Sequence, residues 1–542
     1  MTTPHRRIRE PLPGEPRPAR DEGDADRPGR TDRVVFGVAA AVTLAFVVWG
    51  VLGTDSLASA SKAVLTWIIT HVGWAFVLVA SGFVLFALWL AVSRYGRIPL
   101  GRDGERPEFK SVSWIAMMFS AGMGIGLMFY GVNEPLSHFV KPPPGTVPAG
   151  SDEALQTAMA TTLFHWTVHP WAIYAVVGLA IAYGSFRRGR SQLISAAFGP
   201  LLGRRAEGAA GRAIDVLAIF ATLFGSAASL GLGALQIGSG LSIAGWDAGN
   251  AVLVGVIAVL TVVFVASAVS GVAKGIQWLS NTNMVLAVVL AAFVFVVGPT
   301  VFVLNLVPAA IGDYFRDLAD MAGRTAASGG DATEAWLSGW TIFYWAWWIS
   351  WTPFVGMFIA RISRGRTIRQ FVAGVIGVPS AVSLLWFCVF GGTAIHVQRN
   401  GTDLAGESSP ESQLFALLDH FPLAAVAGVV VILLVAIFFV SGADAASVVM
   451  GTLSQRGSIA PTKGVVVFWG VLTGAMAAVM LLVGGSDALT GLQNLTIIAA
   501  LPFAAVMVGL CVSLAKDLRT DPLFATPPPT PAAPAGTTQS PP

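Results

Sequence analysis

Residues 120–131 read SAGMGIGLMFYG, where glycine stands at every second position from Gly122 to Gly126 and again at Gly131. The stretch lies inside an apolar window, 113–134, that is long enough to cross a bilayer core of about 30 Å. Glycines in a membrane helix are in general more typical of close packing between helices. Each glycine also destabilises a helix by about 1 kcal/mol relative to alanine. Because these glycines alternate, which is not the spacing of packing motifs, they favour a broken membrane helix whose freed backbone groups face a cavity.

The rest of the chain has the composition of a helical membrane protein. Of its 542 residues, 54% are hydrophobic and 12% charged, and the mean hydropathy is +0.70. The apolar runs are continuous and lack the alternating polarity of barrel strands, which predicts helices. Twelve spans are predicted, near residues 34–53, 72–93, 113–134, 158–186, 213–243, 250–268, 279–304, 335–361, 368–391, 421–451, 464–484 and 491–515.

Basic residues favour one side of this map. All but five of the 33 Lys and Arg fall in the two tails or in the loops on the same side as the tails. Because basic loops stay in the cytoplasm, both termini are predicted to be cytoplasmic and the protein to lie in the inner (plasma) membrane. The five on the other side are Lys62, Lys141, Arg316, Arg324 and Arg399.

The segments at the two ends of the chain are polar. Residues 1–32 are charged and lack an apolar core, so they are expected to form a disordered cytoplasmic tail rather than a signal peptide. The membrane core is assigned to 33–516, followed by a short Pro-rich cytoplasmic tail, 517–542. Cys388 and Cys511 lie inside apolar stretches, so a disulfide is not expected.

The first of two aromatic clusters lies at residues 164–175, which read FHWTVHPWAIYA. On one continuous helix, Trp166, Trp171 and Tyr174 would fall within an arc of about 140°. An interfacial aromatic belt is the alternative, although Trp166 lies well inside the apolar window. His165 and His169 have the spacing of paired metal ligands. With no third ligand nearby in the sequence, they are interpreted as polar packing residues.

The second cluster, residues 340–351, contains five tryptophans, and Tyr344, Trp348 and Trp351 share one helical face. Aromatic faces attract a quaternary ammonium, which cannot donate hydrogen bonds, by about 0.5–2 kcal/mol each. Acids are few in the spans. Asp444 is the clearest, whereas Glu134 and Asp215 lie near span ends. The two clusters therefore predict an aromatic cage for a quaternary ammonium.

The tenth predicted span contains polar residues that allow two interpretations. Ser441, Gly442 and Asp444 interrupt its apolar run, so hydroxyls and released carbonyls there could coordinate a small cation. Alternatively, Ser441 bonds back to its own helix. Elsewhere no acid pair, metal set or activated nucleophile is recognised, so no enzymatic activity is expected.

Three motifs together resemble the betaine/choline/carnitine transporter family, and the similarity covers about residues 34–515. The motifs are GMGIGLMFYGVNEPL (122–136), HWTVHPWAIYAVVGLAIAYG (165–184) and FYWAWWISWTPFVGMFIARISRGR (343–366). The resemblance implies a LeuT-like fold with two extra helices followed by an inverted repeat of five plus five, assembled as a homotrimer. The repeats would be 113–304 and 335–516, joined by the connector 305–334, whose amphipathic pattern predicts an interfacial helix.

The resemblance also implies two kinds of site. The substrate site would comprise Trp166, Trp171, Tyr174, Trp348, Trp351, Gly122, Met123, Gly124 and Gly126. Sodium ions would bind at Ser120, Met123, Phe438 and Ser441, and at Thr222, Ser226 and Phe354. Choline-selective relatives tend to hold an acid at the position of Gly126, so glycine here favours a zwitterion such as glycine betaine. Gly442 stands where sodium-dependent relatives usually have a hydroxyl, which weakens the sodium assignment.

These observations predict a secondary transporter that imports glycine betaine or a similar compatible solute with Na⁺ as the coupling ion. A proton-coupled or exchange carrier for choline, carnitine, ectoine or a sulfonium analogue stays open. A non-transporting membrane sensor or a channel is the alternative from another class, although a channel would need polar residues along a continuous pore. The expected partners are the solute and the lipid bilayer, with no nucleic acid and no other cofactor.

Overall fold

The structure is a computed structural model that describes residues 30–243, 245–246, 249–270, 273–485 and 487–524. Within these ranges the regular elements are helices, and the only β-type pairing is an isolated bridge between Pro99 and Thr367. The predicted all-α class is therefore confirmed. Most of the two predicted tails lies outside the described residues.

The described part of the chain runs through α-helices α1 to α18 and several single turns. The first ten helices are α1 (Arg33–Leu52), α2 (Thr54–Val92), α3 (Ser111–Gly122), α4 (Ile125–Val140), α5 (Asp152–Trp166), α6 (Val168–Ala182), α7 (Gly199–Leu202), α8 (Ala209–Ile243), α9 (Asn250–Ser270) and α10 (Ala273–Val297). The other eight are α11 (Thr300–Gly323), α12 (Ala326–Gly339), α13 (Thr341–Ile362), α14 (Ile368–Arg399), α15 (Gln413–Leu418), α16 (Ala424–Ser454), α17 (Lys463–Val483) and α18 (Ala488–Leu518). Two of the turns, η3 (Tyr183–Arg187) and η6 (Pro522–Phe524), are used below.

Most of the predicted spans are helices that could cross a membrane on their own. Among the described residues, nine helices are long and apolar enough, or ten if the bent pair of α10 and α11 counts as one span. Two predicted spans fail this test for physical reasons. The window 113–134 is split into α3 and α4, whereas α13 is rich in amphipathic Trp and Tyr. The count of twelve and the inverted repeat stay predictions.

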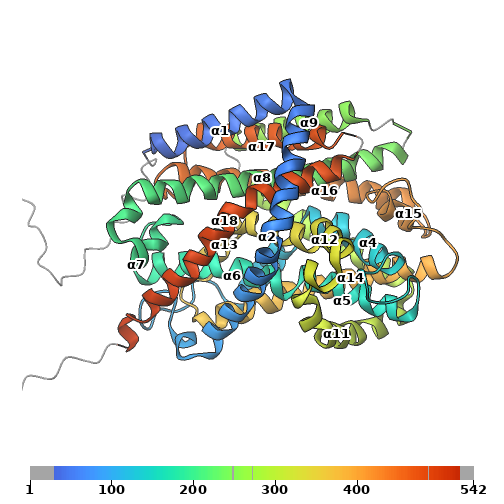
Figure 1. The fold of residues 1–542 in the computed structure, drawn as a ribbon, viewed down its shortest axis with the longest axis horizontal. Helices are drawn as coiled ribbons and strands as arrows, with labels where there is room; N and C mark the ends of the chain where they lie inside the picture. The colour runs from blue at the N-terminus through green and yellow to red at the C-terminus, as the bar shows by residue number, and fades with distance from the viewer. Residues whose placement is uncertain (1–29, 244, 247–248, 271–272, 486, 525–542) are drawn as a thin grey trace, which may run out of the picture.

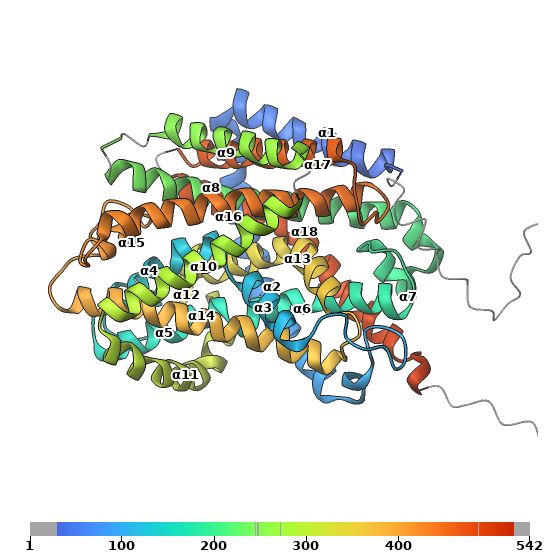
Figure 2. The ribbon, with the colours of Figure 1, turned by 180° about the vertical axis from the view of Figure 1, so that it is seen from behind.

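The helices lie in successive rows across the molecule (Figures 1 and 2). Both views show α1, α9 and α17 side by side along one edge, with α8 and α16 next to them and α4, α5, α13 and α14 beyond. Burial follows this arrangement. The apolar window through α5 and α6 is 94% buried, whereas that of α9 is 17% buried. Helices such as α9 are therefore free to face lipid, and α5, α6 and α13 form the interior.

Two helices depart from their predicted boundaries. Helix α2 begins at Thr54 rather than near residue 72, and its 39 residues extend about 58 Å, which is longer than the bilayer core of about 30 Å. The helix of the connector begins at Thr300 rather than at 305, after a bend of 110°. Pro299 precedes α11 at this bend, because proline cannot continue the preceding helix.

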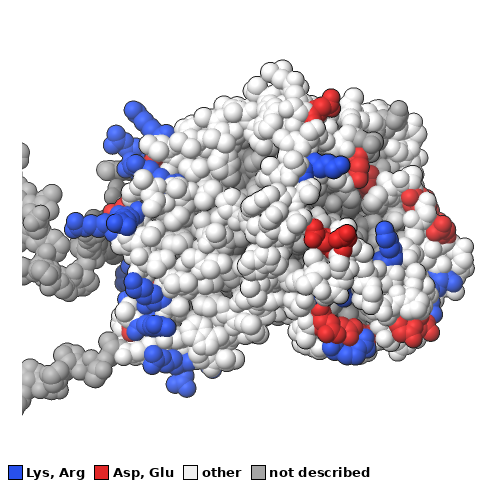
Figure 3. Space-filling model, in the orientation of Figure 1, with Lys and Arg blue, Asp and Glu red and all other residues white. Residues whose placement is uncertain are grey.

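Charged side chains gather at the ends of the molecule. On the face in Figure 3, Lys and Arg dominate one end, acidic residues mixed with a few basic ones lie at the other, and an uncharged band separates them. Ion pairs join loops that the count of Lys and Arg places on the same predicted side of the membrane. Asp32 pairs with Arg212 and Arg456, and Arg364 pairs with Glu105. The described ends of the chain therefore lie on the basic side.

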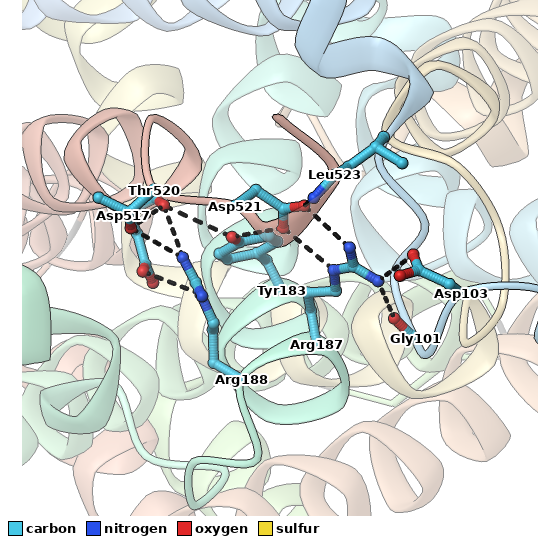
Figure 4. A network of polar contacts seen from close by, with 9 residues as sticks. All are labelled: Gly101, Asp103, Tyr183, Arg187, Arg188, Asp517, Thr520, Asp521 and Leu523. Carbon is cyan, nitrogen blue, oxygen red and sulfur yellow. Dashed lines mark hydrogen bonds and ion pairs between the residues drawn. The ribbon is translucent and has the colours of Figure 1, made fainter. Parts of the chain in front are cut away.

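A network of polar contacts fixes the end of α18 (Figure 4). Arg187 of η3 donates hydrogen bonds to Asp103 at 2.6 Å and to both carboxylate oxygens of Asp521 at 2.8 and 3.0 Å. The Tyr183 hydroxyl also donates to Asp521, at 2.8 Å. Because Asp521 is buried in these contacts, the packed part of the chain continues into η6. The boundary predicted at 516 is therefore too early, and residues 525–542 of the predicted tail lie outside the described residues.

Candidate functional site

Two interior membrane helices are broken. Helix α3 ends at Gly122 and α4 begins at Ile125, with Met123 extended between them. This break lies where the alternating glycines predict it. A second break separates α5 from α6 at Thr167, whose φ and ψ are −116° and −106°. The predicted arc through Trp166, Trp171 and Tyr174 is therefore wrong, because no single helix runs through them.

A cavity of about 40 Å³ lies beside both breaks. Its walls come from α4, α5, α6, α13 and α14, and half of its lining residues are aromatic. The ring centroids of Trp166 and Trp348 are 4.9 Å apart, and those of Tyr174 and Trp348 are 6.2 Å apart. The aromatic cavity, as we call it, is lined by Met123, Gly124, Gly126, Leu127, Trp166, Pro170, Trp171, Tyr174, Trp347, Trp348, Trp351 and Ser383.

Most tryptophans of the aromatic cavity use their indole N–H within the protein. The hydrogen bonds run from Trp166 to Glu134, from Trp347 to Ser229, from Trp348 to the His165 carbonyl and from Trp351 to the Gly225 carbonyl. Because these donors are occupied, the four rings offer carbon surface to the cavity. The hydroxyl of Tyr174, in contrast, is buried without a hydrogen-bond partner among the described residues.

The glycines of the 120–131 stretch have different roles. A Cβ at Gly126 would lie 2.7 Å from a ring atom of Trp347 and 2.8 Å from one of Trp166, so a larger residue must displace both rings. A Cβ at Gly124 would meet nothing within 4 Å. Gly124 lies at the helix break, whereas Gly126 allows close packing of the two tryptophan rings. The two interpretations of the glycines, a broken helix and close packing, therefore both apply, at different positions.

The structure brings the predicted substrate-site residues to one place. Eight of the nine line the aromatic cavity, and Gly122 ends α3 beside it. Tyr344 stacks on Trp348 at 5.9 Å but does not line the cavity. Sequence reasoning missed Trp347, because it singled out only the helical face that carries Tyr344, Trp348 and Trp351. It also missed Leu127, Pro170 and Ser383, and an isolated serine such as Ser383 carries no signal in an apolar helix.

A second cavity, of about 190 Å³, adjoins the first and shares Met123, Gly124 and Trp351 with it. The predicted sodium ligands that line it are Ser120, Met123, Ser226, Phe354, Phe438 and Ser441. The Ser226 hydroxyl is buried and has no hydrogen-bond partner in the described part of the chain. Thr222 does not line this cavity, and its hydroxyl donates to the Ala218 carbonyl at 2.8 Å.

Helix α16 is continuous through the polar residues of the tenth predicted span. Helix geometry runs unbroken from Ala424 to Ser454, so no carbonyl is released near Ser441. The Ser441 hydroxyl donates to the Ile437 carbonyl at 2.8 Å. Of the two interpretations, the one in which the serine bonds to its own helix therefore describes the structure.

The two histidines of the first aromatic cluster have different surroundings. His169 stacks on Trp345 with centroids 5.1 Å apart, whereas His165 Nδ1 lies 2.6 Å from Glu134 Oε1. The third titratable group near His165 is His138, one turn after Glu134 on α4. His165 and His169 do not pair, because the helix break at Thr167 separates them. Glu134 also differs from expectation, since it is fully buried in the interior.

Residues 34–523 match the model of the BCCT family, the betaine/carnitine/choline family transporters. The chain belongs to this family. It is 50% identical over 494 residues to the betaine/ectoine transporter LcoP of Corynebacterium glutamicum, a match that covers 91% of this chain and 78% of that protein. It is 46% identical over 490 residues to the glycine betaine transporter OpuD of Bacillus subtilis, covering 90% and 94%. The ectoine/hydroxyectoine transporter of Virgibacillus pantothenticus is 39% identical over 489 residues, covering 89% and 96%.

The protein is therefore a multi-pass membrane transporter of compatible solutes. In this BCCT transporter, no Asp, Glu, Lys or Arg lines either cavity among the described residues. Asp444 lies on α16 outside both linings, and Asp215 accepts hydrogen bonds from Ser195 at 3.0 and 2.6 Å. The aromatic cavity therefore offers rings, backbone and neutral hydroxyls to a ligand.

Proposed function

We propose that the protein is a secondary transporter that imports glycine betaine, or a similar quaternary-ammonium zwitterion, by Na⁺ symport. The observation that carries this proposal is an uncharged aromatic cavity placed at two helix breaks. Breaks of this kind place backbone groups beside a substrate in many secondary transporters. The names of the relatives support a solute of this class, because they include glycine betaine and ectoine transporters.

The cavity suits the cationic end of such a solute. Trp166, Trp171, Tyr174, Trp347 and Trp348 surround it from three helices, and each ring face attracts a quaternary ammonium by about 0.5–2 kcal/mol. A primary ammonium would need acceptors for its three N–H groups, which these rings do not supply. The site is thus proposed to select a methylated cation over an amine.

The cavity also suits the anionic end. Helix α4 begins at Ile125 and its first turn lines the cavity, so its free N–H groups and positive dipole end lie close to a bound solute. The unpartnered Tyr174 hydroxyl is a further donor. No acid lines the cavity to balance a permanent net cation. We therefore favour a zwitterion over choline, and ectoine, which is also a zwitterion, is the second candidate solute.

Sodium coupling is proposed from the second cavity. It joins the α3–α4 break to α8 and α16, and its Ser226 hydroxyl is buried without a partner among the described residues. Coupling by protons is the alternative, supported by two observations. Gly442 contributes no hydroxyl, and the Ser441 hydroxyl is already bonded within α16.

The orientation follows from the charges. The basic end of the molecule in Figure 3 holds the described ends of the chain, so we place both termini in the cytoplasm and the protein in the inner membrane. The homotrimer implied by the family stays a prediction. A channel is disfavoured, because the two cavities line broken helices in the interior rather than one continuous polar path.

Uptake of labelled glycine betaine into proteoliposomes tests the proposal, with sodium and proton gradients imposed separately. An inward sodium gradient is expected to drive uptake above the equilibrium level, and a proton gradient imposed in the absence of sodium is expected to drive no uptake. Uptake driven by protons and indifferent to sodium would replace the symport assignment with proton coupling. If betaine is not taken up under any gradient but ectoine is, ectoine would replace glycine betaine as the proposed solute.

A further inference from the structure

Glu134 connects the aromatic cavity to a cluster of buried titratable groups. Its Oε2 accepts hydrogen bonds from the Trp166 indole at 2.6 Å and from the Tyr344 hydroxyl. Its Oε1 lies 2.6 Å from His165 Nδ1, and the other nitrogen of His165 lies 2.9 Å from Thr341 Oγ1. Trp166 is therefore shared, because its ring lines the aromatic cavity while its N–H holds this carboxylate.

His138 completes the cluster but is not hydrogen-bonded in it. Its Nε2 lies 3.6 Å from Glu134 Oε1, and both of its ring nitrogens are buried without a hydrogen-bond partner among the residues that the structure describes. A buried imidazole without a partner is costly, since it gives up its hydrogen bonds to water. Its position beside a carboxylate gives it an immediate acceptor once it is protonated.

The geometry favours a proton over a metal ion at this cluster. Two ligands of a tetrahedral ion at about 2.0–2.1 Å lie roughly 3.3 Å from each other. The 2.6 Å separation of His165 Nδ1 and Glu134 Oε1 is shorter and matches a charge-assisted hydrogen bond. Both oxygens of Glu134 are already used, which leaves no free carboxylate edge for an ion.

A polar cavity lies near the cluster. This further cavity, of about 790 Å³, is lined by Arg324, whose guanidinium lies 5.2 Å above the Trp336 ring. The Trp336 and His138 ring centroids are 5.5 Å apart. The Trp336 side chain therefore separates a polar vestibule from the cluster.

We propose that Glu134, His138 and His165 form a proton-binding site whose occupancy is linked to solute binding through Trp166. Buried ionisable residues inside membrane helices commonly form proton sites of this kind. The inference rests on the proposed function, because it requires a quaternary-ammonium solute in the aromatic cavity. The other titratable or charged groups facing the cluster are His169, Tyr130, Tyr344 and Arg324, with Glu411 beyond Tyr130.

Electrostatics sets the sign of the linkage. An ammonium on the Trp166 face lies near the Glu134 carboxylate and stabilises its anionic form, so solute binding expels a proton from the cluster. Binding equilibria are reciprocal, so added protons must weaken solute binding by the same factor. The solute carboxylate does not titrate in this range, because carboxyl groups of this type ionise far below neutral pH.

The test measures glycine betaine binding to the purified full-length protein. In weakly buffered solution, a pH indicator should report proton release on betaine addition. The dissociation constant from tryptophan fluorescence should rise about tenfold from about pH 8 to about pH 5.5. In Glu134→Gln, which keeps acceptors for Trp166 and Tyr344, both the release and the pH dependence should be lost. Asp215→Asn, a buried carboxylate remote from the cavity, should retain both.

The outcomes separate this inference from the proposed function. Betaine that binds to the wild-type protein without proton release, and with a constant affinity across this pH range, would overturn the proton site alone. Failure of betaine to bind at any pH would instead overturn the proposed function. If Glu134→Gln does not fold, two measurements still test the proton site. They are proton release from the wild-type protein and the pH dependence of betaine affinity in His138→Gln, which is expected to be reduced. Tight binding of zinc chloride alone that is lost in His138→Gln would establish a metal site instead.

Discussion

At the residue scale, Trp348 is central to the aromatic cavity. Its ring centroid lies 4.7 Å from Trp347, 4.9 Å from Trp166 and 6.2 Å from Tyr174. Trp348→Leu removes one aromatic face and loosens its neighbours, so the dissociation constant for glycine betaine should rise about tenfold or more. Equilibrium binding of labelled betaine measures this. Trp469→Leu changes a buried tryptophan remote from the cavity and should leave the affinity of the folded protein unchanged; equal losses in both variants would contradict the assignment.

Two neighbouring glycines provide a second test at this scale. Gly126→Ala places a methyl group against Trp166 and Trp347, so those rings must shift and betaine affinity should fall by about tenfold. Gly124→Ala meets no atom within 4 Å, and its extended backbone suits any residue. It should therefore lose much less affinity. A larger loss in Gly124→Ala than in Gly126→Ala would show that the packing at Gly126 is unimportant.

The sequence contains enough to predict the aromatic residues of the site but not the surroundings of Glu134. Tryptophan and tyrosine clusters inside apolar windows predict a cation cage from residue type alone. The partners of Glu134 come from α5 and α13, and only the packing of those helices brings Trp166 and Tyr344 to its carboxylate. Glu134 therefore looked peripheral in the sequence, because it lies near the end of a predicted span, although its side chain is buried in the interior.

At the scale of elements, the helix breaks differ in how clearly the sequence signals them. The break between α3 and α4 follows from alternating glycines, whereas the break at Thr167 has a weaker signal in Pro170. Proline is tolerated in the first turn of a helix, so Pro170 is compatible with a helix that begins at Val168. The polar residues of α16 left two interpretations open, and the Ser441 hydroxyl bonds within a continuous helix.

The contacts of α8 predict which hydroxyl matters for sodium. Ser226 lines the second cavity with an unpartnered hydroxyl among the described residues, whereas Thr222 bonds to its own helix outside it. Ser226→Ala should raise the sodium concentration for half-maximal betaine uptake by about tenfold, the cost of one lost ligand. Thr222→Ala should change it less than about twofold. The reverse order in sodium titrations of uptake would move the ion site to Thr222.

At the scale of the whole molecule, the contacts in Figure 4 hold the end of the chain against the helical core. Arg187 and Asp521 are almost completely buried in their ion pair. Arg187→Ala leaves a buried carboxylate without its cation, which should cost roughly 3 kcal/mol and lower the thermal unfolding midpoint in detergent. Arg399→Ala removes an exposed pair with Asp152 and should cost less than about 1 kcal/mol. Equal midpoints for the two variants would show that the network does not stabilise the fold.

The same network predicts a dependence on pH. Burial opposes ionisation of Asp521, but hydrogen bonds from Arg187, the Leu523 N–H and Tyr183 outweigh it and hold its pKa below the usual 3.8. Because the pKa is lower in the folded state, this stabilisation is present above pH 3.8 and is lost as pH falls through the folded value. Thermal unfolding in acid should therefore affect the wild-type protein more than Arg187→Ala, and parallel curves would contradict this role for Asp521.

The charge distribution is the whole-molecule property that the sequence predicts best. Counting Lys and Arg placed the loops on two sides, and ion pairs such as those of Asp32 with Arg212 and Arg456 join loops from one side. The charge count succeeds because it needs only the positions of the spans along the sequence, which decide the side of the membrane on which each loop lies. The early start of α2 and the bend before α11 depend on packing between distant helices, and composition does not encode them.

The most direct measurement of the central claim is the position of the bound solute. Arsenobetaine replaces the nitrogen of glycine betaine with arsenic, a strong anomalous scatterer, and keeps its charges and shape. In crystals of the protein grown with it, an anomalous difference map should show one arsenic peak in the aromatic cavity among Trp166, Tyr174 and Trp348. A peak at another position, with none in this cavity, would contradict the account.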